Sequence, residues 1–369
     1  MAPLADDDPD KWDYTLHTGV KHEILTKYID GWIRIAGSFR QMYYYDCFAG
    51  KGEYNQGQLG SPIIVMQYMQ KHAAKGIDFN CVCIEKNKNN HDNLMAVCNR
   101  EKVNFPGVNF EIHNESFEEL ITRIPESLNS RNDYPSFFFI DPFGIKVPFK
   151  IVSSLCKYDH SEVLVTFMSK NMARFLESNR HTGAIEETLG SSFDQSILDL
   201  DLEERQQALV DIYKTNLKNH AKYVMSYRLK ESTTNITTYH LIHGSNHFEA
   251  FKLMKDILYN QGAEGTFTFH GPKENILGKG QTRLTEPTEE NEFREWLIQE
   301  CAGKTLRFWD IMKETYERTK FIEKHYRAAI QQLAKDQTIA LVGQGSRGGI
   351  NRDTLIKFPS NPNVQKTLF

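Results

Sequence analysis

Short runs of apolar residues alternate with amphipathic segments along the first half of the chain. The strand-like runs lie at 42–47, 79–84, 108–112, 136–140 and 162–168, and helical spacing of apolar residues marks 19–36, 61–74, 86–99, 116–123 and 147–157. Several runs are apolar on both faces, which is typical of parallel strands covered by helices on each side. The pattern therefore predicts an α/β fold with a mostly parallel sheet.

The pattern changes after the fifth run. Residues 171–221 are predicted to form a mostly helical insertion, and the runs 222–230 and 237–243 to form an antiparallel hairpin around a Thr-Thr-Asn turn. A helix is expected at about 247–260. Gly, Pro, Thr and Glu dominate the following stretch, which indicates a linker. We therefore expect a tail at 1–14, a first domain at 15–262 and a linker at 263–289.

Beyond the linker the order is helix, helix, helix and hairpin. Residues 290–301 and 305–318 are amphipathic, and a third segment has a core face made of Phe321, Ile322, Tyr326, Ala329, Ile330 and Leu333. Two strand-like runs, 338–342 and 354–358, enclose a Gly-rich loop with basic residues. This order is typical of a winged helix, which predicts a winged-helix domain at 290–360 and a tail at 361–369.

The charge distribution favours a polyanion partner for this C-terminal part. The whole chain has a net charge of -4, yet residues 301–369 hold 12 Lys and Arg against 6 Asp and Glu. On the third helix, Lys324, Arg327 and Gln331 share one outward stripe, and Arg347 lies in the loop of the hairpin. Phosphates would attract the basic side chains, and Gln331 is suited to read base edges. The alternatives are a winged helix that binds protein and an ordinary solvated surface.

Composition sets limits more than it indicates chemistry. Of the 369 residues, 40% are apolar and 25% are charged, as in soluble globular proteins. No apolar run approaches the roughly 20 residues that span a bilayer. The acidic start of the chain, with Asp6, Asp7, Asp8 and Asp10, indicates a solvated tail instead of a signal peptide. The six cysteines include no Cys-x-x-Cys pair, which predicts buried reduced thiols in a cytoplasmic protein and no metal site.

The most informative residues follow the first strand-like run. The segment Asp46-Cys47-Phe48-Ala49-Gly50-Lys51-Gly52 places a carboxylate and a glycine-containing turn at the end of a strand. Glycine lets the backbone approach a ligand closely, so we expect a cofactor loop made of Asp46, Phe48, Ala49, Gly50 and Gly52. The pattern resembles motif I of class I S-adenosylmethionine (AdoMet)-dependent methyltransferases, which have a Rossmann-like fold, and this resemblance implies AdoMet as the cofactor. The alternative is a tight turn without a ligand.

Two later strand ends fit the same hypothesis. Glu85 ends the second run, where dinucleotide and AdoMet folds place an acid that accepts hydrogen bonds from ribose hydroxyls. The alternative is that Glu85 caps the helix that begins near Lys86. After the third run, Ser116 and Phe117 occupy the place where such folds contact adenine.

The chemistry is expected after the fourth run, in Asp141-Pro142-Phe143-Gly144. Amino-methyltransferases carry Asp/Asn/Ser-Pro-Pro-aromatic there; the carboxylate and the next carbonyl align the target amine, and the aromatic stacks on a flipped base. We predict Asp141, Pro142 and Phe143 as catalytic residues, although Phe143 replaces the second proline and Gly144 the aromatic. The alternative is a helix-capping turn after a buried strand. No Pro-Cys dipeptide occurs, so the nucleophile of cytosine C5 methylation is missing.

Together these segments resemble the three-Cys-motif partner proteins, a family of bacteria and their mobile elements. The resemblance covers nearly all of 17–360, with slight departures at Cys47 and His243-Gly244. It rests on four segments: His17-Thr18 with Lys21-His22-x-Ile24-Leu25, Tyr45–Gly50 with Gly60-Ser61-Pro62, Phe139–Gly144, and Leu241–His247 continuing through Met254. It implies a class I methyltransferase domain, a winged helix and a neighbouring partner protein with three cysteines. Lys21 and His22 would line the active site or serve as surface or packing residues.

We therefore predict an AdoMet-dependent methyltransferase that methylates a nucleobase amine in DNA or RNA presented by the winged helix. The alternatives are a non-catalytic module that binds nucleic acid or protein, and methylation of a small molecule or a protein partner. Gln365-Lys366-Thr367-Leu368-Phe369 also resembles the peptide with which bacterial replication and repair proteins bind the sliding clamp. Its alternative is an unstructured tail.

Overall fold

The computed structural model describes residues 13–122, 134–178, 181–230, 237–262, 268–269, 287–342 and 349–360. The chain divides into two compact units, Met1–Ile276 and Leu277–Phe369, and each is considered by itself. Arg347 and the predicted sliding-clamp peptide at 365–369 lie outside the described residues.

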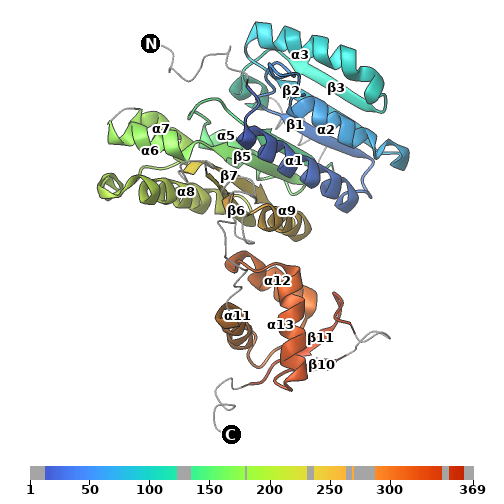
Figure 1. Ribbon diagram of the computed structural model, residues 1–369, viewed down its shortest axis with the longest axis vertical. Helices are drawn as coiled ribbons and strands as arrows, with labels where there is room; N and C mark the ends of the chain where they lie inside the picture. Colours follow the sequence, from blue (N-terminus) through green and yellow to red (C-terminus); the bar gives the residue numbers. More distant parts are fainter. Residues whose placement is uncertain are drawn as a thin grey trace, which may run out of the picture. The chain divides into compact units, whose positions relative to one another are not determined.

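The first unit is built on an eight-stranded sheet with the order β3-β2-β1-β4-β5-β7-β6-β8 (Figure 1). Strand β7 is antiparallel to β5 and β6, and every other neighbouring pair is parallel. The strand order reverses between β1 and β4, which is the switch point where such sheets bind ligands. The strands are β1 (Gln41–Asp46), β2 (Asp78–Ile84), β3 (Val108–His113), β4 (Ser136–Ile140), β5 (Ser161–Phe167), β6 (Tyr223–Lys230), β7 (Thr237–Ser245) and β8 (Thr268–Phe269).

Helices cover both faces of this sheet. Helix α1 contacts α2 and α9 on one face, while α5, α6, α7 and α8 contact one another on the other (Figure 1). The helices are α1 (Leu16–Ile35), α2 (Ser61–Gln70), α3 (Lys88–Glu101), α5 (Phe149–Leu155), α6 (Ser169–Glu177), α7 (Thr182–Leu189), α8 (Leu202–Lys218) and α9 (Phe248–Gln261). The described part of this unit also contains the short 3-10 helices η1 (Ala73–Lys75), η2 (Lys102–Asn104) and η3 (Gln195–Asp199).

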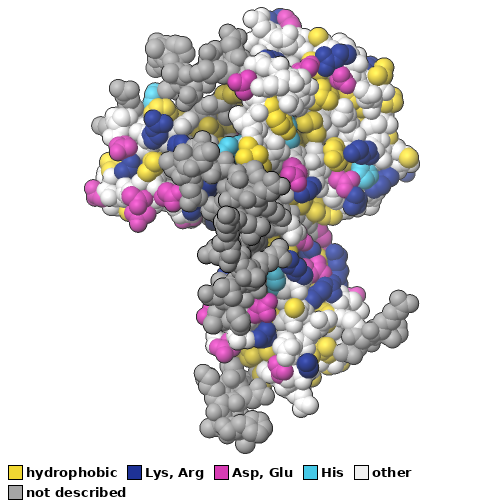
Figure 2. Space-filling model, in the orientation of Figure 1, with side chains coloured by type: hydrophobic (Ala, Val, Ile, Leu, Met, Phe, Trp, Pro, Cys, Tyr) yellow, Lys and Arg dark blue, Asp and Glu magenta, His cyan; other side chains and the backbone are white. Residues whose placement is uncertain are grey.

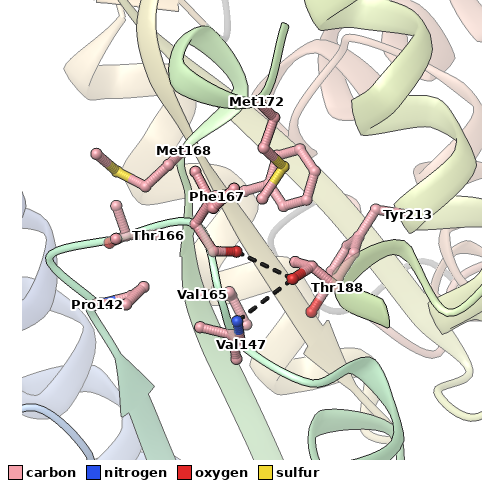
Figure 3. Close-up of a pocket in the computed structure, with 11 residues that line it drawn as sticks. Pro142, Val147, Val165, Thr166, Phe167, Met168, Met172, Thr188 and Tyr213 are labelled. Carbon is pink, nitrogen blue, oxygen red and sulfur yellow. Dashed lines mark hydrogen bonds between the residues drawn. The ribbon is translucent and has the colours of Figure 1, made fainter. Parts of the chain in front are cut away.

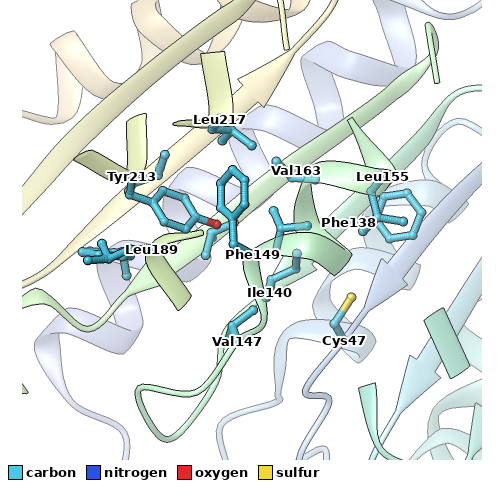
Figure 4. Close-up of a cluster of buried hydrophobic side chains, with 14 of the residues drawn as sticks. Cys47, Phe138, Ile140, Val147, Phe149, Leu155, Val163, Leu189, Tyr213 and Leu217 are labelled. Carbon is cyan, nitrogen blue, oxygen red and sulfur yellow. The ribbon is translucent and has the colours of Figure 1, made fainter. Parts of the chain in front are cut away.

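Strand β4 is buried along its whole length because it has helices on both sides. Phe138 and Ile140 face the cluster that Figure 4 shows, which α5, α7 and α8 complete with Phe149, Leu189 and Tyr213. Phe137 points to the other face and contacts the rings of Tyr28 and Trp32 in α1. Each fully buried large side chain contributes about 1.5–3 kcal/mol of transfer free energy, so this central strand holds the two layers together.

A buried carboxylate fixes the direction of α1. Glu162 of β5 is 4% exposed and accepts hydrogen bonds from the Tyr28 hydroxyl and, at 3.0 Å, from Trp32 Nε1. Burial and the Glu162 charge raise the pKa of Tyr28 well above its usual value. An isolated carboxylate is costly to bury, so α1 must keep both donors in place. Because Glu162 lies near the start of β5, the N-terminal end of α1 reaches the opposite, carboxyl edge of the sheet.

In the described residues of the second unit, three α-helices combine with a three-stranded antiparallel sheet in the order β10-β11-β9. Its apolar core is formed by Phe293, Leu297, Ile311, Tyr326, Ile330 and Ile356. The elements are α11 (Pro287–Glu300), β9 (Thr305–Arg307), α12 (Phe308–Thr315), η5 (Tyr316–Arg318), α13 (Glu323–Lys335), β10 (Ala340–Val342) and β11 (Leu355–Lys357). The helical prediction for 305–318 was wrong at its start, because Thr305–Arg307 pair with β11 instead.

The predicted class, an α/β fold with a mostly parallel sheet and flanking helices, is confirmed. The residues predicted as a helical insertion contain α6, α7, η3 and α8, and the expected linker contains the two-residue strand β8. All six cysteines are buried. Among the described residues, no helix has both the length and the apolar character to cross a membrane.

Candidate active site

Three acidic residues follow neighbouring parallel strands at one edge of the sheet. Asp46 ends β1, Glu85 follows β2 and Asp141 follows β4. Since β1 pairs in parallel with both β2 and β4, the three residues share the carboxyl edge around the switch point. The structure therefore brings together acids that lie far apart in the sequence.

The loop after β1 requires glycine at two positions. Gly50 and Gly52 have φ angles of 65° and 79°, in the left-handed region that other residues rarely adopt. A Cβ atom on Gly52 would lie 2.8 Å from Cδ1 of Leu94 in α3. Ala49 is buried, and its N–H donates to the Ile84 carbonyl at 2.9 Å. The loop is thus a closed turn against the end of β2, and glycine at these positions is a structural necessity.

Asp46 is fully buried below this loop. The hydroxyls of Tyr44 and Ser61 donate to its Oδ2 at 2.8 Å and 2.7 Å. Its Oδ1 has no hydrogen-bond partner among the described residues. Burial raises the pKa of Asp46 to about 7, although the two hydroxyls act in the opposite direction. Among the residues that the structure describes, no basic side chain is paired with this buried carboxylate.

Glu85 links the glycine loop to the next strand. Its Oε2 accepts the Gly50 N–H at 2.9 Å and its Oε1 accepts the Asn87 N–H at 2.7 Å. Burial raises its pKa, and these two backbone donors lower it. The alternative that Glu85 caps the following helix is wrong, because Asn87 is the N-cap of α3 and accepts from its N–H groups. A carboxylate has about four lone-pair sites, so Glu85 keeps acceptor capacity for a ligand.

The two residues predicted to contact adenine have internal partners. Ser116 and Glu119 form a reciprocal cap, in which the Ser116 hydroxyl donates to Oε2 of Glu119 at 2.8 Å and accepts from its N–H at 3.2 Å. Phe117 is only 2% exposed and belongs to the core cluster. Its ring contacts Phe48 of the glycine loop at a centroid distance of 5.4 Å. Phe48 is partly buried, so the contact between the two rings packs the glycine loop against the hydrophobic core.

Asp141 is paired with a lysine from α1. Lys21 Nζ lies 2.7 Å from Oδ1 and 2.5 Å from Oδ2, and the two side chains are 13% and 24% exposed. The same Nζ lies 5.3 Å from the centre of the Tyr239 ring in β7. The alternative of a helix-capping turn is wrong for Asp141, because α5 begins later, at Phe149, with Pro148 in the cap position.

Three aromatic rings adjoin this ion pair. The ring centroids of Tyr14, His22 and Tyr54 are separated by 5.2–5.9 Å. Burial lowers the pKa of His22 to about 4, with a further lowering by Lys21, so the imidazole is neutral at pH 7. Burial, followed by the charges of Asp141 and Asp46, raises the pKa of Tyr54 above its usual value. The pKa of the Tyr54 hydroxyl therefore depends on the charges of both carboxylates.

The start of the described chain is held by the loop after β1. The Tyr14 N–H donates to the Gln56 side chain at 2.9 Å, and Gln56 donates to Asp13 at 3.0 Å. Residues 13 and 14 were expected to belong to a solvated tail. In the structure, the Tyr14 ring packs against the rings of His22 and Tyr54.

Pro142 and Phe143 follow Asp141 and differ in their surroundings. Phe143 is 54% exposed and therefore lies at the surface. Pro142 lines a cavity of about 10 Å³ with Thr166, Thr188 and Tyr213 (Figure 3). Inside it, the Thr188 hydroxyl bridges the Ile145 carbonyl and the Val147 N–H. Ligand pockets are roughly 300–1,000 Å³, so this cavity has room for about one water molecule and not for a base.

The residues predicted to bind nucleic acid lie on α13, except Arg347. Lys324 and Gln331 are exposed. Arg327 donates to Glu323 and to the Ile350 carbonyl, and its guanidinium lies 4.8 Å from the centre of the Phe308 ring. Arg327 therefore joins α13 to α12 and to the segment before β11. Figure 2 shows Lys and Arg side chains on the visible face of this unit, with Asp and Glu side chains between them.

Sequence reasoning missed several residues of the site. Ser61 was noted only within the Gly-Ser-Pro resemblance, yet its hydroxyl binds Asp46. Tyr14 and Tyr54 carried no sequence signal. Tyr44 was assigned to an apolar strand, and only strand alternation could have indicated that it shares a face with Asp46.

No model of a known protein family matches the chain, and no curated protein matches its sequence. Among solved structures, the chain is similar to a protein described as an O-methyltransferase from Klebsiella pneumoniae, with a TM-score of 0.31, 8% identity, and coverage of 64% of this chain and 83% of that one. The chain is also similar to WbdD, with a TM-score of 0.37, 11% identity, and coverage of 93% of this chain and 76% of that one. A third similar structure is Trm1 from Pyrococcus horikoshii in complex with S-adenosyl-L-methionine. Its TM-score is 0.37 and its identity 9%, with coverage of 98% of this chain and 95% of that one. These TM-scores are low, so the chain's own topology and site are the basis for its function.

Proposed function

We propose that this chain is an AdoMet-dependent methyltransferase that acts on an exocyclic amine of a nucleobase. The observation that carries the proposal is the set of three carboxylates, Asp46, Glu85 and Asp141, at the carboxyl ends of three adjacent parallel strands. A sheet with this switch point binds its ligand there. A glycine loop, two acids for a nucleoside-like ligand and a third acid for an amine together match this reaction class.

The residues present fit AdoMet. The unpartnered Oδ1 of Asp46 suits the ammonium group of the methionine moiety, because it would supply the cation that the buried carboxylate lacks. Glu85 retains acceptor capacity for the ribose hydroxyls. Gly50 and Gly52 allow the left-handed backbone of the loop that would surround the ligand. When bound, AdoMet supplies an electrophilic methyl group on its sulfonium.

The chain's contribution to transfer is alignment. The Asp141 carboxylate would accept an N–H of the target amine and orient the nitrogen lone pair. A neutral aromatic amine needs orientation more than it needs a strong base. His22 is neutral at pH 7, so it adds no second positive charge beside Lys21. The rings of Tyr14, His22 and Tyr54 provide apolar surface for a planar base.

The second unit would act as a winged helix that presents the polymer. The order of its elements supports this, since α13 precedes the hairpin strands β10 and β11 and exposes Lys324 and Gln331. A partner protein with three cysteines and a sliding-clamp contact through 365–369 are further proposals that rest on sequence resemblance alone.

One observation favours a second candidate function, a non-catalytic binding module on the same fold. Lys21 bonds to both oxygens of Asp141, so in this state a lysine already occupies the carboxylate that the reaction assigns to the target amine. A module of this kind would bind AdoMet or nucleic acid without transferring a methyl group.

Two measurements test the proposed function. Calorimetry with the full chain should detect AdoMet and its demethylated product S-adenosylhomocysteine; absence of both would refute the cofactor site. Mass spectrometry of nucleosides from cells with the protein, without it and with Asp141→Asn should reveal an N-methylated base only with the unaltered protein. Binding of AdoMet without any such base would favour the binding module.

The nucleic-acid interface has its own test. Lys324→Ala should weaken binding of duplex DNA or RNA about two- to fivefold and reduce the slope of log affinity against log salt by about one. The matched control is Lys313→Ala, which removes an exposed lysine on α12 instead. Equal losses in both variants would indicate general attraction and not an interface on α13.

A further inference from the structure

The ion pair between Lys21 and Asp141 has a specific geometry. A single primary amine donates to both oxygens of the carboxylate that the proposed function assigns to the target amine. Helix α1 is fixed in direction by Tyr28 and Trp32 on Glu162, so Lys21 is delivered to this place by the fold. A solvent-exposed surface pair would have no such restraint, and the Lys21 side chain is only 13% exposed.

The surroundings allow the lysine to leave the carboxylate without leaving the site. Asp141 is 24% exposed, so an incoming group can reach it. The Tyr239 ring lies 5.3 Å from Nζ, within the range in which an aromatic face attracts an ammonium. Lysine has a flexible four-carbon stem that permits such a short movement. The ammonium already lies within reach of this ring while it is bonded to Asp141, so the ring would still attract it after the carboxylate is released.

We propose that Lys21 is a stand-in for the target amine, which holds the Asp141 carboxylate in place until a substrate amine displaces it. The inference rests on the proposed function, because it concerns the same carboxylate. Lys21 is thus a positioning residue that acts through Asp141.

The displaced lysine also determines which amines are accepted. Its charge stays within the site, where it repels a protonated alkylamine and leaves a neutral aromatic amine unaffected. A methyl-accepting substrate without an N–H group cannot replace the hydrogen bonds that Lys21 donates to Asp141. The substrate class that this geometry selects is a neutral amine with at least one N–H, as in the exocyclic amines of nucleobases.

A set of three cofactor analogues tests the inference without an identified substrate. Sinefungin carries a primary amine where AdoMet carries its sulfonium methyl, so its amine is directed at the target position. AdoMet is a cation there without an N–H, and S-adenosylhomocysteine has neither charge nor N–H at that atom. Calorimetry would compare the three ligands with the full chain, with Lys21→Met and with Lys21→Arg.

The expected result is selective. Lys21→Met should tighten sinefungin about fivefold relative to AdoMet, because the amine no longer competes with Lys21 for Asp141. Affinity for S-adenosylhomocysteine should stay within about twofold, which also shows that the variant is folded. Lys21→Arg retains a cation for Asp141 and should keep the original ratio. Asp141→Asn in the Lys21→Met background should abolish the gain.

Other outcomes overturn the inference. Equal tightening of AdoMet and sinefungin by Lys21→Met would mean that Lys21 acts only through its charge, and no change would mean that it does not compete. If Lys21→Met does not fold, Lys21→Ala is measured in its place with the same criteria. If the unaltered chain binds none of the three ligands, the proposed cofactor site fails, and the inference fails with it.

Discussion

Asp46 and Asp141 follow two adjacent strands of one sheet, yet their environments are opposite. Asp46 is fully buried, and the hydroxyls of Tyr44 and Ser61 both donate to its Oδ2. Burial raises its pKa to about 7, while these hydroxyls and the Phe48 backbone N–H act in the opposite direction. Asp141 is 24% exposed and has a lysine ammonium on both oxygens. One carboxylate lacks a cation and the other already has one.

The difference teaches how one sheet edge assigns two tasks to the same residue type. A buried carboxylate with an unpartnered oxygen favours a ligand that brings its own positive charge. An accessible carboxylate with an exchangeable donor favours a ligand that brings an N–H. On this basis, we expect Asp46 to contribute to cofactor binding and Asp141 to methyl transfer.

The largest expected effect separates Asp141 from cofactor binding. Asp141→Asn should reduce methyl transfer to total RNA or DNA about 10²- to 10³-fold, because the amide no longer offers two acceptors to align the amine. Affinity for S-adenosylhomocysteine should remain unchanged in calorimetry. A variant that keeps its turnover but loses the cofactor would reverse the assignment of the two carboxylates.

The corresponding substitution at the end of β1, Asp46→Asn, should reduce the affinity for the cofactor product. Asp46→Asn keeps an acceptor for Tyr44 and Ser61 but removes the charge, so S-adenosylhomocysteine should bind about 30- to 100-fold more weakly. The measurement is calorimetry at pH 8, with Asp141→Asn as the control. An unchanged affinity would show that the ammonium of the ligand does not contact Asp46.

The raised pKa of Asp46 predicts a pH dependence with a definite sign. Below pH 7 the carboxyl holds a proton that a cationic ligand must displace, so affinity for S-adenosylhomocysteine should rise between pH 6 and 8, by at most about tenfold per pH unit. The folded state binds this proton more tightly than the unfolded state, so stability from this group is present at low pH. It is lost as pH rises from about 4 towards 7. Both trends should disappear in Asp46→Asn, and their persistence there would assign them to another group.

A glycine substitution probes the loop on the Asp46 side alone. Gly52→Ala combines a φ of 79° with a Cβ 2.8 Å from Leu94, and should lower the free energy of unfolding by about 2–3 kcal/mol. Gly76→Ala has a similar φ of 70° but no atom within 4 Å of the new Cβ, and should cost only about 1 kcal/mol. Urea unfolding measures both. Equal losses would mean that crowding by α3 does not shape the loop.

The smallest expected effect concerns one donor to Asp46. Ser61→Ala removes a hydrogen bond that lowers the Asp46 pKa, so the carboxyl should ionise at higher pH. Affinity for S-adenosylhomocysteine should fall about two- to fourfold at pH 7 and recover at pH 9. A loss that is the same at both pH values would indicate a packing effect instead.

The placement of the three acids was predictable because it depends on local pattern and one rule of topology. Apolar runs marked the strands to within a residue or two; Asp46 lies at the end of such a run, and Glu85 and Asp141 each follow one. The carboxyl ends of parallel strands share an edge, so the acids had to lie near one another. The strand β9 was not predictable in this way, because three residues with no strong pattern depend on β11 for their hydrogen bonds.

Partners of individual side chains were not predictable. Arg327 falls on the outward stripe of α13 by helical spacing, yet it bonds to Glu323 and to the Ile350 carbonyl, which lies 23 residues away. Phe117 was expected to contact adenine, and in the structure its side chain is buried in the hydrophobic core cluster. Spacing indicates which face a residue is on, whereas its partners depend on which elements arrive opposite that face.

The sequence by itself determined the α/β class, the strand ends and the glycine positions, because apolar periodicity and backbone conformation are properties of short segments. Only the tertiary structure decided that Lys21 meets Asp141, that Ser61 meets Asp46, and that Tyr14, His22 and Tyr54 gather beside them. The physical reason is that charge state and access depend on desolvation and on neighbours from distant segments. These two quantities arise when α1 packs across the sheet with Tyr28 and Trp32 bonded to Glu162.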